Sequence, residues 1–106
     1  MQLDFEGAVY QWRGPQPYFF VRVPEPESEA LHDVAHVSYG WGMIPVEVTL
    51  QGLTWETSLW PKDGGYLVPI RAHVRKKLAI DADDVVTLQL TVAQRHGRAV
   101  NPEPKD

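Results

Sequence analysis

Cysteine is absent from this 106-residue sequence, and its absence removes several kinds of chemistry at once. A chain without thiols forms no disulfides, offers no thiolate ligands to a metal and has no cysteine nucleophile. No apolar run approaches the roughly 18–20 residues that a membrane-spanning helix needs. The opening residues, MQLDFEGAVYQW, have no basic start and alternate polar with apolar side chains, unlike a signal peptide. We therefore expect a cytoplasmic protein that does not associate with a membrane.

Positive charge is also scarce. Ten Lys and Arg stand against fourteen Asp and Glu, which gives a net charge of −4 at pH 7. Binding to nucleic acid depends on a basic surface, so the composition argues against a nucleic-acid partner. The charge is uneven, however, because basic residues gather between positions 71 and 77 and acidic residues between 25 and 33. A local basic patch is therefore compatible with this acidic chain.

The sequence contains enough apolar residues, 43% of the total, for a single hydrophobic core. Its length suits one domain, which we place at residues 1–93. Residues 94–106 lack any apolar periodicity, and we expect them to form a flexible C-terminal tail.

Alternation of polar and apolar side chains predicts six strands, and two further segments have helical spacing. The first helix is expected to follow Ser28 as its N-cap. The order is strand, strand, helix, strand, used twice, and the shared spacing of Trp12–Tyr18 and Trp60–Tyr66 suggests a duplication. We therefore predict a mainly β protein, a small pseudo-duplicated ββαβ barrel of about six strands with two short helices. The predicted strands cover residues 3–9, 18–23, 44–52, 53–60, 65–70 and 84–92, and the predicted helices cover 28–37 and 72–80.

The run Lys62-Asp63-Gly64-Gly65 is the segment that most resembles a phosphate-binding loop. Such a loop opens into the N-terminus of a helix, where backbone amides point at the anion. Here the glycines lead into a predicted strand, and Asp63 would repel an anion. An Asp-Gly pair between two alternating segments is instead typical of a tight hairpin turn, which is our prediction.

Metal binding and catalysis have little support in the sequence. His32 and His36 are four residues apart on a predicted helix, but a catalytic zinc site needs three protein ligands, so we interpret them as surface residues. Glu47 and Glu56 fit outward positions on adjacent strands. No serine has the context of an activated nucleophile. We expect no metal and no cofactor, and the sequence favours a protein that is not an enzyme while leaving catalysis open.

Four short motifs follow one another along the chain: Gly52, Thr57-Ser58-Leu59-x-Pro61, Gly65-Tyr66-Leu67-x-Pro69 and Val74-Arg75-Lys76. With these motifs, most of the chain resembles a bacterial family of unknown function, DUF1905. The resemblance implies a double-split β-barrel in which one chain supplies both halves, so that a monomer would be complete. It implies no activity.

Residues 67–90 are also similar to the swapped-hairpin half of AbrB-type regulators and related antitoxins. In that family a proline and a short Arg-x-x-Leu helix precede an acidic turn, usually Gly-Asp. This chain has Asp83-Asp84 there, and aspartate tolerates a left-handed turn. The resemblance makes a DNA-binding or antitoxin-like module the alternative function. The matching residues are Pro69, Arg75, Leu78, Asp84 and Val86.

The tryptophans offer the best candidate site. Trp55 alternates in phase with core leucines, whereas Trp60 is out of phase. Exposed aromatic rings beside cations could bind a ring or an anion by stacking and cation–π contact, although they could equally cap the ends of the barrel. Our main hypothesis is a non-catalytic module that binds an unknown small molecule or protein, with an uncharacterised enzyme as the third possibility. The candidate ligand-binding residues are Trp12, Arg13, Trp41, Trp60, Lys62, Arg71 and Arg75.

Overall fold

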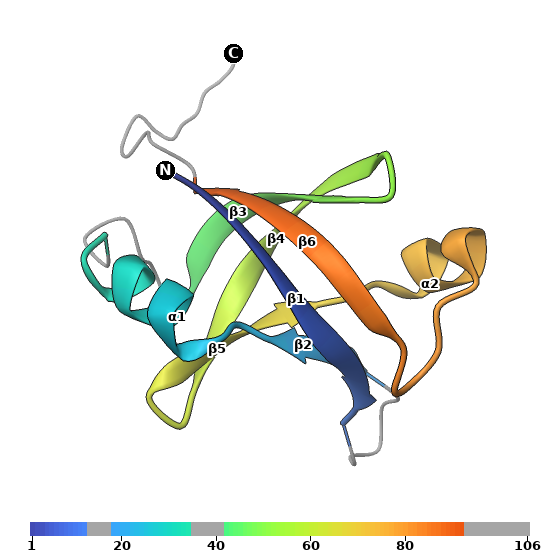
Figure 1. Ribbon diagram of the computed structural model, residues 1–106, viewed down its shortest axis with the longest axis horizontal. Coiled ribbons are helices and arrows are strands. Elements are labelled where there is room, and N and C mark those ends of the chain that lie inside the picture. Colours follow the sequence, from blue (N-terminus) through green and yellow to red (C-terminus); the bar gives the residue numbers. More distant parts are fainter. Residues whose placement is uncertain (13–17, 35–41, 93–106) are drawn as a thin grey trace.

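The computed structural model describes residues 1–12, 18–34 and 42–92. It confirms the six strands, the two helices and their order (Figure 1). The predicted tail, and the domain boundary proposed at residue 93, lie outside the described residues. The elements are β1 (Gln2–Gln11), β2 (Phe19–Arg22), α1 (Glu25–His32), β3 (Ile44–Leu50), β4 (Leu53–Lys62), β5 (Gly65–Pro69), α2 (Ala72–Leu78) and β6 (Val85–Val92).

The strands close into an antiparallel barrel in the order β1-β2-β5-β4-β3-β6. Exchanging the two halves of the chain, so that β1 becomes β4, β2 becomes β5 and β3 becomes β6, leaves this order unchanged. The duplicated ββαβ architecture is therefore confirmed at the level of topology. Closure also leaves the sheet without an unpaired edge. The two helices lie at opposite sides of the barrel (Figure 1).

The barrel interior is filled by the alternating apolar residues that the sequence predicts to face inward. On β3, for example, Ile44 and Val48 are fully buried while Glu47 is exposed. Trp55 is 9% exposed and belongs to the same core. This burial supplies the hydrophobic stabilisation that a domain of this size needs.

Gly7 lies where β1 leaves one neighbour for another. Residues 2–8 pair with β6, whereas residues 9–11 pair with β2. A Cβ atom at Gly7 would lie 2.6 Å from Cγ1 of the buried Val21. A larger residue here would have to displace that methyl group, so glycine is what lets β1 pass so close to Val21.

Helix α1 begins earlier than the sequence analysis predicts. Pro24 is the N-cap and Pro26 lies in the first turn, where the fixed φ of proline suits a helix start. Ser28, the predicted N-cap, is instead buried inside the helix, where its hydroxyl donates to the carbonyl of Val23 at 3.3 Å. The prediction for Ser28 is therefore wrong. The helix also ends earlier than predicted, at His32, so its predicted continuation over residues 33 and 34 is wrong, while residues 35–37 lie outside the described residues.

Helix α2 begins where the sequence analysis predicts, at Ala72, but ends two residues earlier than predicted, at Leu78. Val74 is buried beneath the helix, and Ala79 ends it in the left-handed conformation with φ of 55°. Asp83 adopts φ of 74°, the left-handed geometry expected for the acidic turn before β6. The carboxylate of Asp84 accepts a hydrogen bond from the Asp81 amide at 2.8 Å, which closes the turn. No helix among the described residues is long and apolar enough to cross a membrane.

Trp12 and Trp60 do not occupy equivalent positions in the two halves of the barrel, although the shared spacing of Trp12–Tyr18 and Trp60–Tyr66 suggests that they do. In the second half Trp60 lies opposite Leu67, while the corresponding pair in the first half is Tyr10 opposite Phe20. Leu67 and Phe20 hold equivalent positions in the two halves: both lie on the outer wall of the barrel, and each is 1% exposed. The connection between β1 and β2 differs in length from the connection between β4 and β5. Residues at equivalent positions in the two halves are therefore not separated by one constant number of residues.

Candidate functional site

The segment Lys62–Gly65 is a hairpin turn, as predicted. Lys62 and Gly65 are partners at the end of the β4–β5 ladder. Asp63 and Gly64 between them have φ of 51° and 79°. Positive φ at both central residues is the geometry of the turn that joins twisted antiparallel strands, and Asp-Gly suits it.

The carbonyl groups of this turn are held by two side chains from the other half of the protein. Arg22 donates to the carbonyls of Lys62 and Asp63 at 3.1 and 3.2 Å. His32 Nε2 lies 3.1 Å from the carbonyl of Gly64 and must donate, because a carbonyl only accepts. The turn therefore presents acceptors to cationic and N–H groups, which is the reverse of a phosphate cradle.

His32 has a structural position rather than a metal-binding one in the described part of the protein. Besides its contact with the turn, its ring packs edge-on against Tyr66, with the centroids 5.4 Å apart. His36 lies outside the described residues. Among the residues described, no three His, Cys, Asp or Glu side chains come together as a metal site would require.

An outer aromatic cluster covers the barrel wall over β2. Phe20 points outward yet is only 1% exposed, because the rings around it shield it from water. The nearest is Trp60, with centroids 5.0 Å apart. These rings pack on one another outside the hydrophobic core of the barrel. The cluster comprises Tyr10, Trp12, Tyr18, Phe20 and Trp60.

Burial raises the pKa of the Tyr10 phenol, while Arg22 partly lowers it and Asp63 raises it further. Burial alone raises the pKa of Tyr66. Both phenols are therefore neutral at physiological pH, since their ordinary value is already about 10. They contribute apolar ring surface and neutral hydroxyl groups, not negative charge, to this side of the barrel.

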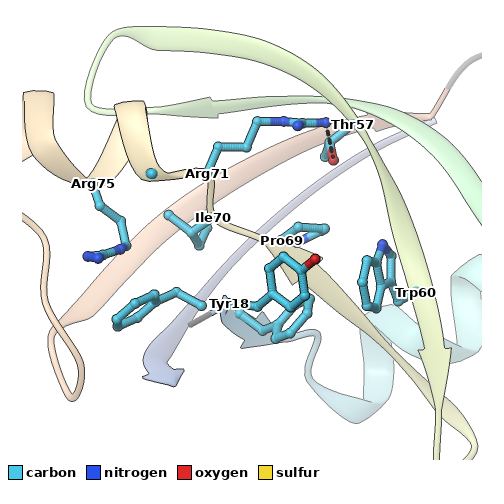
Figure 2. Close-up of a pocket in the computed structure, with 10 residues that line it drawn as sticks. Tyr18, Thr57, Trp60, Pro69, Ile70, Arg71 and Arg75 are labelled. Carbon is cyan, nitrogen blue, oxygen red and sulfur yellow. Dashed lines mark hydrogen bonds between the residues drawn. The ribbon is translucent and has the colours of Figure 1, made fainter. Parts of the chain in front are cut away.

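A pocket of about 410 Å³ adjoins the outer aromatic cluster, where β2, β4 and β5 meet the start of α2 (Figure 2). It brings together three of the predicted site residues: Trp60, Arg71 and Arg75. Arg71 extends from α2 toward Thr57 on one side, and Tyr18 and Trp60 lie across from it (Figure 2). The described lining residues are Tyr18, Phe19, Phe20, Thr57, Trp60, Pro69, Ile70, Arg71, Ala72 and Arg75.

The remaining predicted site residues do not line this pocket. Trp12 and Lys62 contact each other instead, with the Lys62 ammonium 5.1 Å from the centroid of the Trp12 ring. Lys62 also lies 3.8 Å from the carboxylate of Asp63. Arg13 and Trp41 lie outside the described residues.

The two arginines are held differently. Arg71 Nη2 donates to Thr57 Oγ1 at 3.4 Å, a long contact that orients an otherwise exposed side chain. The guanidinium carbon of Arg75 lies 3.5 Å from the centroid of the Phe19 ring, a close cation–π stack. Its Nε is buried and has no hydrogen-bond partner in the described part of the protein. An unpaired buried donor costs about 1–3 kcal/mol, which the stack on Phe19 offsets in part.

Neither arginine is neutralised by an acidic side chain in the described structure. The salt bridge between Lys62 and Asp63 is the only one among residues 1–12, 18–34 and 42–92. Among the described lining residues, the charged groups are Arg71 and Arg75 and no carboxylate is present. Among the described residues, the pocket therefore combines two arginines that no carboxylate pairs with and walls of aromatic and aliphatic side chains.

The sequence analysis missed Tyr18 and Thr57, which help to form the pocket. The consecutive aromatics Tyr18, Phe19 and Phe20 contain a usable signal, because adjacent strand residues point to opposite faces. Phe19 enters the core, and so Phe20 has to pack on the outside. Thr57 has no comparable signal, since its role depends on where α2 places Arg71.

Comparison with known proteins identifies the family. The model of DUF1905, a domain of unknown function, matches residues 5–90. The match covers most of the chain, so this protein belongs to the DUF1905 family, as its motifs indicated. No curated protein matches the chain.

Proposed function

We propose that this member of the DUF1905 family is a non-catalytic binding module whose ligand is a small organic anion, held in the pocket between β4 and α2. One observation carries the proposal: Arg71 and Arg75 both line an apolar pocket in which no described residue supplies a carboxylate. A positively charged pocket without its own counter-charge is suited to a ligand that brings one.

The size and composition of the pocket support a small ligand. Its volume of about 410 Å³ falls within the roughly 300–1,000 Å³ typical of small-molecule sites, which are mostly apolar with a few polar groups. Guanidinium groups bind carboxylates and phosphates through two parallel N–H donors. Arg71 is well placed for this, since its contact with Thr57 engages one nitrogen, Nη2.

The chemistry of the lining supports binding over catalysis. General acid–base catalysis uses His, Asp, Glu, Lys, Tyr or Cys side chains, and a hydroxyl nucleophile such as Thr has to be activated by an adjacent base. The described lining offers only the hydroxyls of Tyr18 and Thr57 besides the two arginines. These groups can orient an anion, and they do not form a nucleophile with an adjacent base.

Calorimetric titration with a panel of organic anions tests the proposal. The informative variant is Arg71→Ala/Arg75→Ala, which removes both charges from the pocket. Lys76→Ala/Lys77→Ala is the matched control, because it removes two charges from the same helix at exposed positions outside the lining. We expect an anion to bind the wild type and the control but not the arginine variant. Equal binding to all three proteins, or no binding to the wild type by any anion, would contradict the proposal.

The alternative, a DNA-binding module, is favoured by the exposed Lys76 and Lys77 on α2. Three exposed aspartates, at positions 81, 83 and 84, follow the helix and would interrupt a continuous basic surface. Gel-shift titration with duplex DNA at low salt distinguishes the two functions. A shift that disappears in Lys76→Ala/Lys77→Ala would favour DNA binding.

Because one chain closes the barrel by itself, we further propose that the module acts as a monomer. Sedimentation equilibrium tests this directly. A monomer mass across the concentration range is expected, and a concentration-dependent dimer would contradict it.

A further inference from the structure

We infer that the anion is an aromatic oxyanion: a flat ring that packs against Trp60 and Tyr18, with an acidic group received by Arg71. This inference rests on the proposed function and makes it more specific. The positive charge of the pocket would attract an anion of any shape. The aromatic side chains determine which uncharged group the ligand should carry.

The first argument is the geometry of the rings. Trp60 and Tyr18 are 38% and 49% exposed, so each has ring surface free to bury. Their centroids lie 6.0 Å apart at 66°, an edge-to-face arrangement that holds both rings in place. The buried Phe20 supports both of them from beneath. A third ring can add to this arrangement by stacking or edge contact, which an alkyl chain cannot do.

The second argument is the position of the charge relative to the rings. Arg71 reaches over the pocket to Thr57, and Tyr18 and Trp60 lie opposite it (Figure 2). A ligand ring on the aromatic wall would therefore place a substituent within reach of the Arg71 guanidinium. Pro69 and Ile70 form the apolar surface between them.

Arg75 has a supporting part in this arrangement. Phe19 occupies one face of its guanidinium at 3.5 Å, and the residue lines the pocket. Because the stack fixes the guanidinium, its charge is directed at the pocket without needing a hydrogen bond to the ligand. Arg75 thus raises the positive potential around the ligand, while Arg71 makes the directional contact.

A carboxylate and a phosphate monoester would both satisfy a guanidinium fork, and their shared chemistry is an oxyanion on a ring. A neutral ring would leave both arginines without a counter-charge. An aliphatic acid would leave the aromatic surface exposed to water. Affinity should therefore require the ring and the charge together.

Titration calorimetry with four probes tests the inference: 2-naphthoate, 2-naphthyl phosphate, the neutral 2-naphthamide and octanoate. We expect at least one naphthyl anion to bind about tenfold or more tightly than both naphthamide and octanoate. Preference for the carboxylate or the phosphate identifies which oxyanion the site takes.

Matched variants locate the interaction. Trp60→Ala should weaken binding of the naphthyl anion by about tenfold. Trp12→Ala should have little effect on binding, although the Trp12 ring is equally exposed and also packs on Phe20. Arg71→Ala should likewise weaken binding, and Arg71→Lys should restore only part of it because the fork is lost. If Trp60→Ala does not fold, Tyr18→Ala gives the same readout at a half-exposed ring.

The possible outcomes separate the inference from the proposed function. If octanoate binds as tightly as the naphthyl anions and still depends on the arginines, the aromatic class is wrong and anion binding stands. If Trp12→Ala and Trp60→Ala have equal effects, the ring does not sit in this pocket and the inference also fails. If no anion binds the wild type, neither in this set nor in the wider panel, the proposed function fails with it.

Discussion

Replacing Phe20 by alanine should destabilise the protein as strongly as a substitution in the core, although Phe20 lies on the outer wall. The side chain is 1% exposed, and its ring contacts four others at centroid distances between 5.0 and 6.4 Å. Phe→Ala at buried positions costs about 3–5 kcal/mol. The covering rings are partly exposed and can settle into the gap, so we expect the lower end, about 3 kcal/mol.

That loss is large against a total stability of about 5–15 kcal/mol. Urea unfolding followed by far-ultraviolet circular dichroism should show a lower midpoint with an unchanged slope, since the fold itself is retained. Each kcal/mol corresponds to about 4–8 °C for a domain of this size, so the melting temperature should fall by about 12–24 °C. Phe20→Leu, which keeps apolar bulk without the ring, should cost less.

Trp12→Ala is the control for this prediction, because Trp12 packs on Phe20 at 6.2 Å but is 38% exposed. Its loss should cost less than the loss of Phe20, because more than a third of the Trp12 side chain is already exposed to water. If Phe20→Ala costs no more than Trp12→Ala, then the rings do not cover Phe20. The aromatic wall of the pocket would in that case not be preformed, and the reasoning about the ligand would lose its basis.

Three further predictions concern the close approach, the turn and the tyrosines. Gly7→Ala should cost about 1–3 kcal/mol in denaturant unfolding, because its Cβ would meet Val21 at 2.6 Å, and the cost should shrink in a Val21→Ala background. Arg22→Ala should remove two hydrogen bonds to the β4–β5 turn, worth about 0.5–1.5 kcal/mol each, and hydrogen exchange should speed up there and not in β3. Because burial raises the pKa of Tyr10 and Tyr66, the stability that these two groups contribute should be constant below their ordinary value of about 10 and should fall as pH rises above it. Phenylalanine at both positions should reduce that alkaline loss, and an unchanged pH profile of unfolding would count against burial as its cause.

Much of the fold could be predicted because the barrel repeats one simple rule along every strand. Residues such as Ile44 and Val48 alternate with polar neighbours, and closure of the sheet buries one face of all six strands. The turn at Asp63-Gly64 was equally clear, since few residue pairs adopt positive φ at both positions. The strand alternation and the turn both depend on residues that are neighbours along the chain, so they can be predicted from the sequence alone.

The features that could not be predicted depend on neighbours in space. The start of α1 was misplaced because Ser28 is a good N-cap in isolation, whereas Pro24 and the buried hydrogen bond to Val23 decide the actual start. The predicted equivalence of Trp12 and Trp60 is wrong because the two hairpins have connections of different length, which changes the strand register between the halves. The sequence predicts Trp60, Arg71 and Arg75 as site residues but does not predict the contact between Arg71 and Thr57. That contact depends on where α2 lies on the barrel.

An NMR titration that follows the arginine Nε–H and tryptophan indole N–H signals tests the central claim most directly. On addition of a bound aromatic oxyanion, the signals of Arg71, Arg75 and Trp60 should move together along one saturation curve. Trp12, outside the pocket, and Trp55, buried in the core, should move little. Changes centred on Trp12 or on Arg22, which lie outside the pocket, or the absence of any saturable change with the whole panel of anions, would contradict the claim that this pocket binds an organic anion.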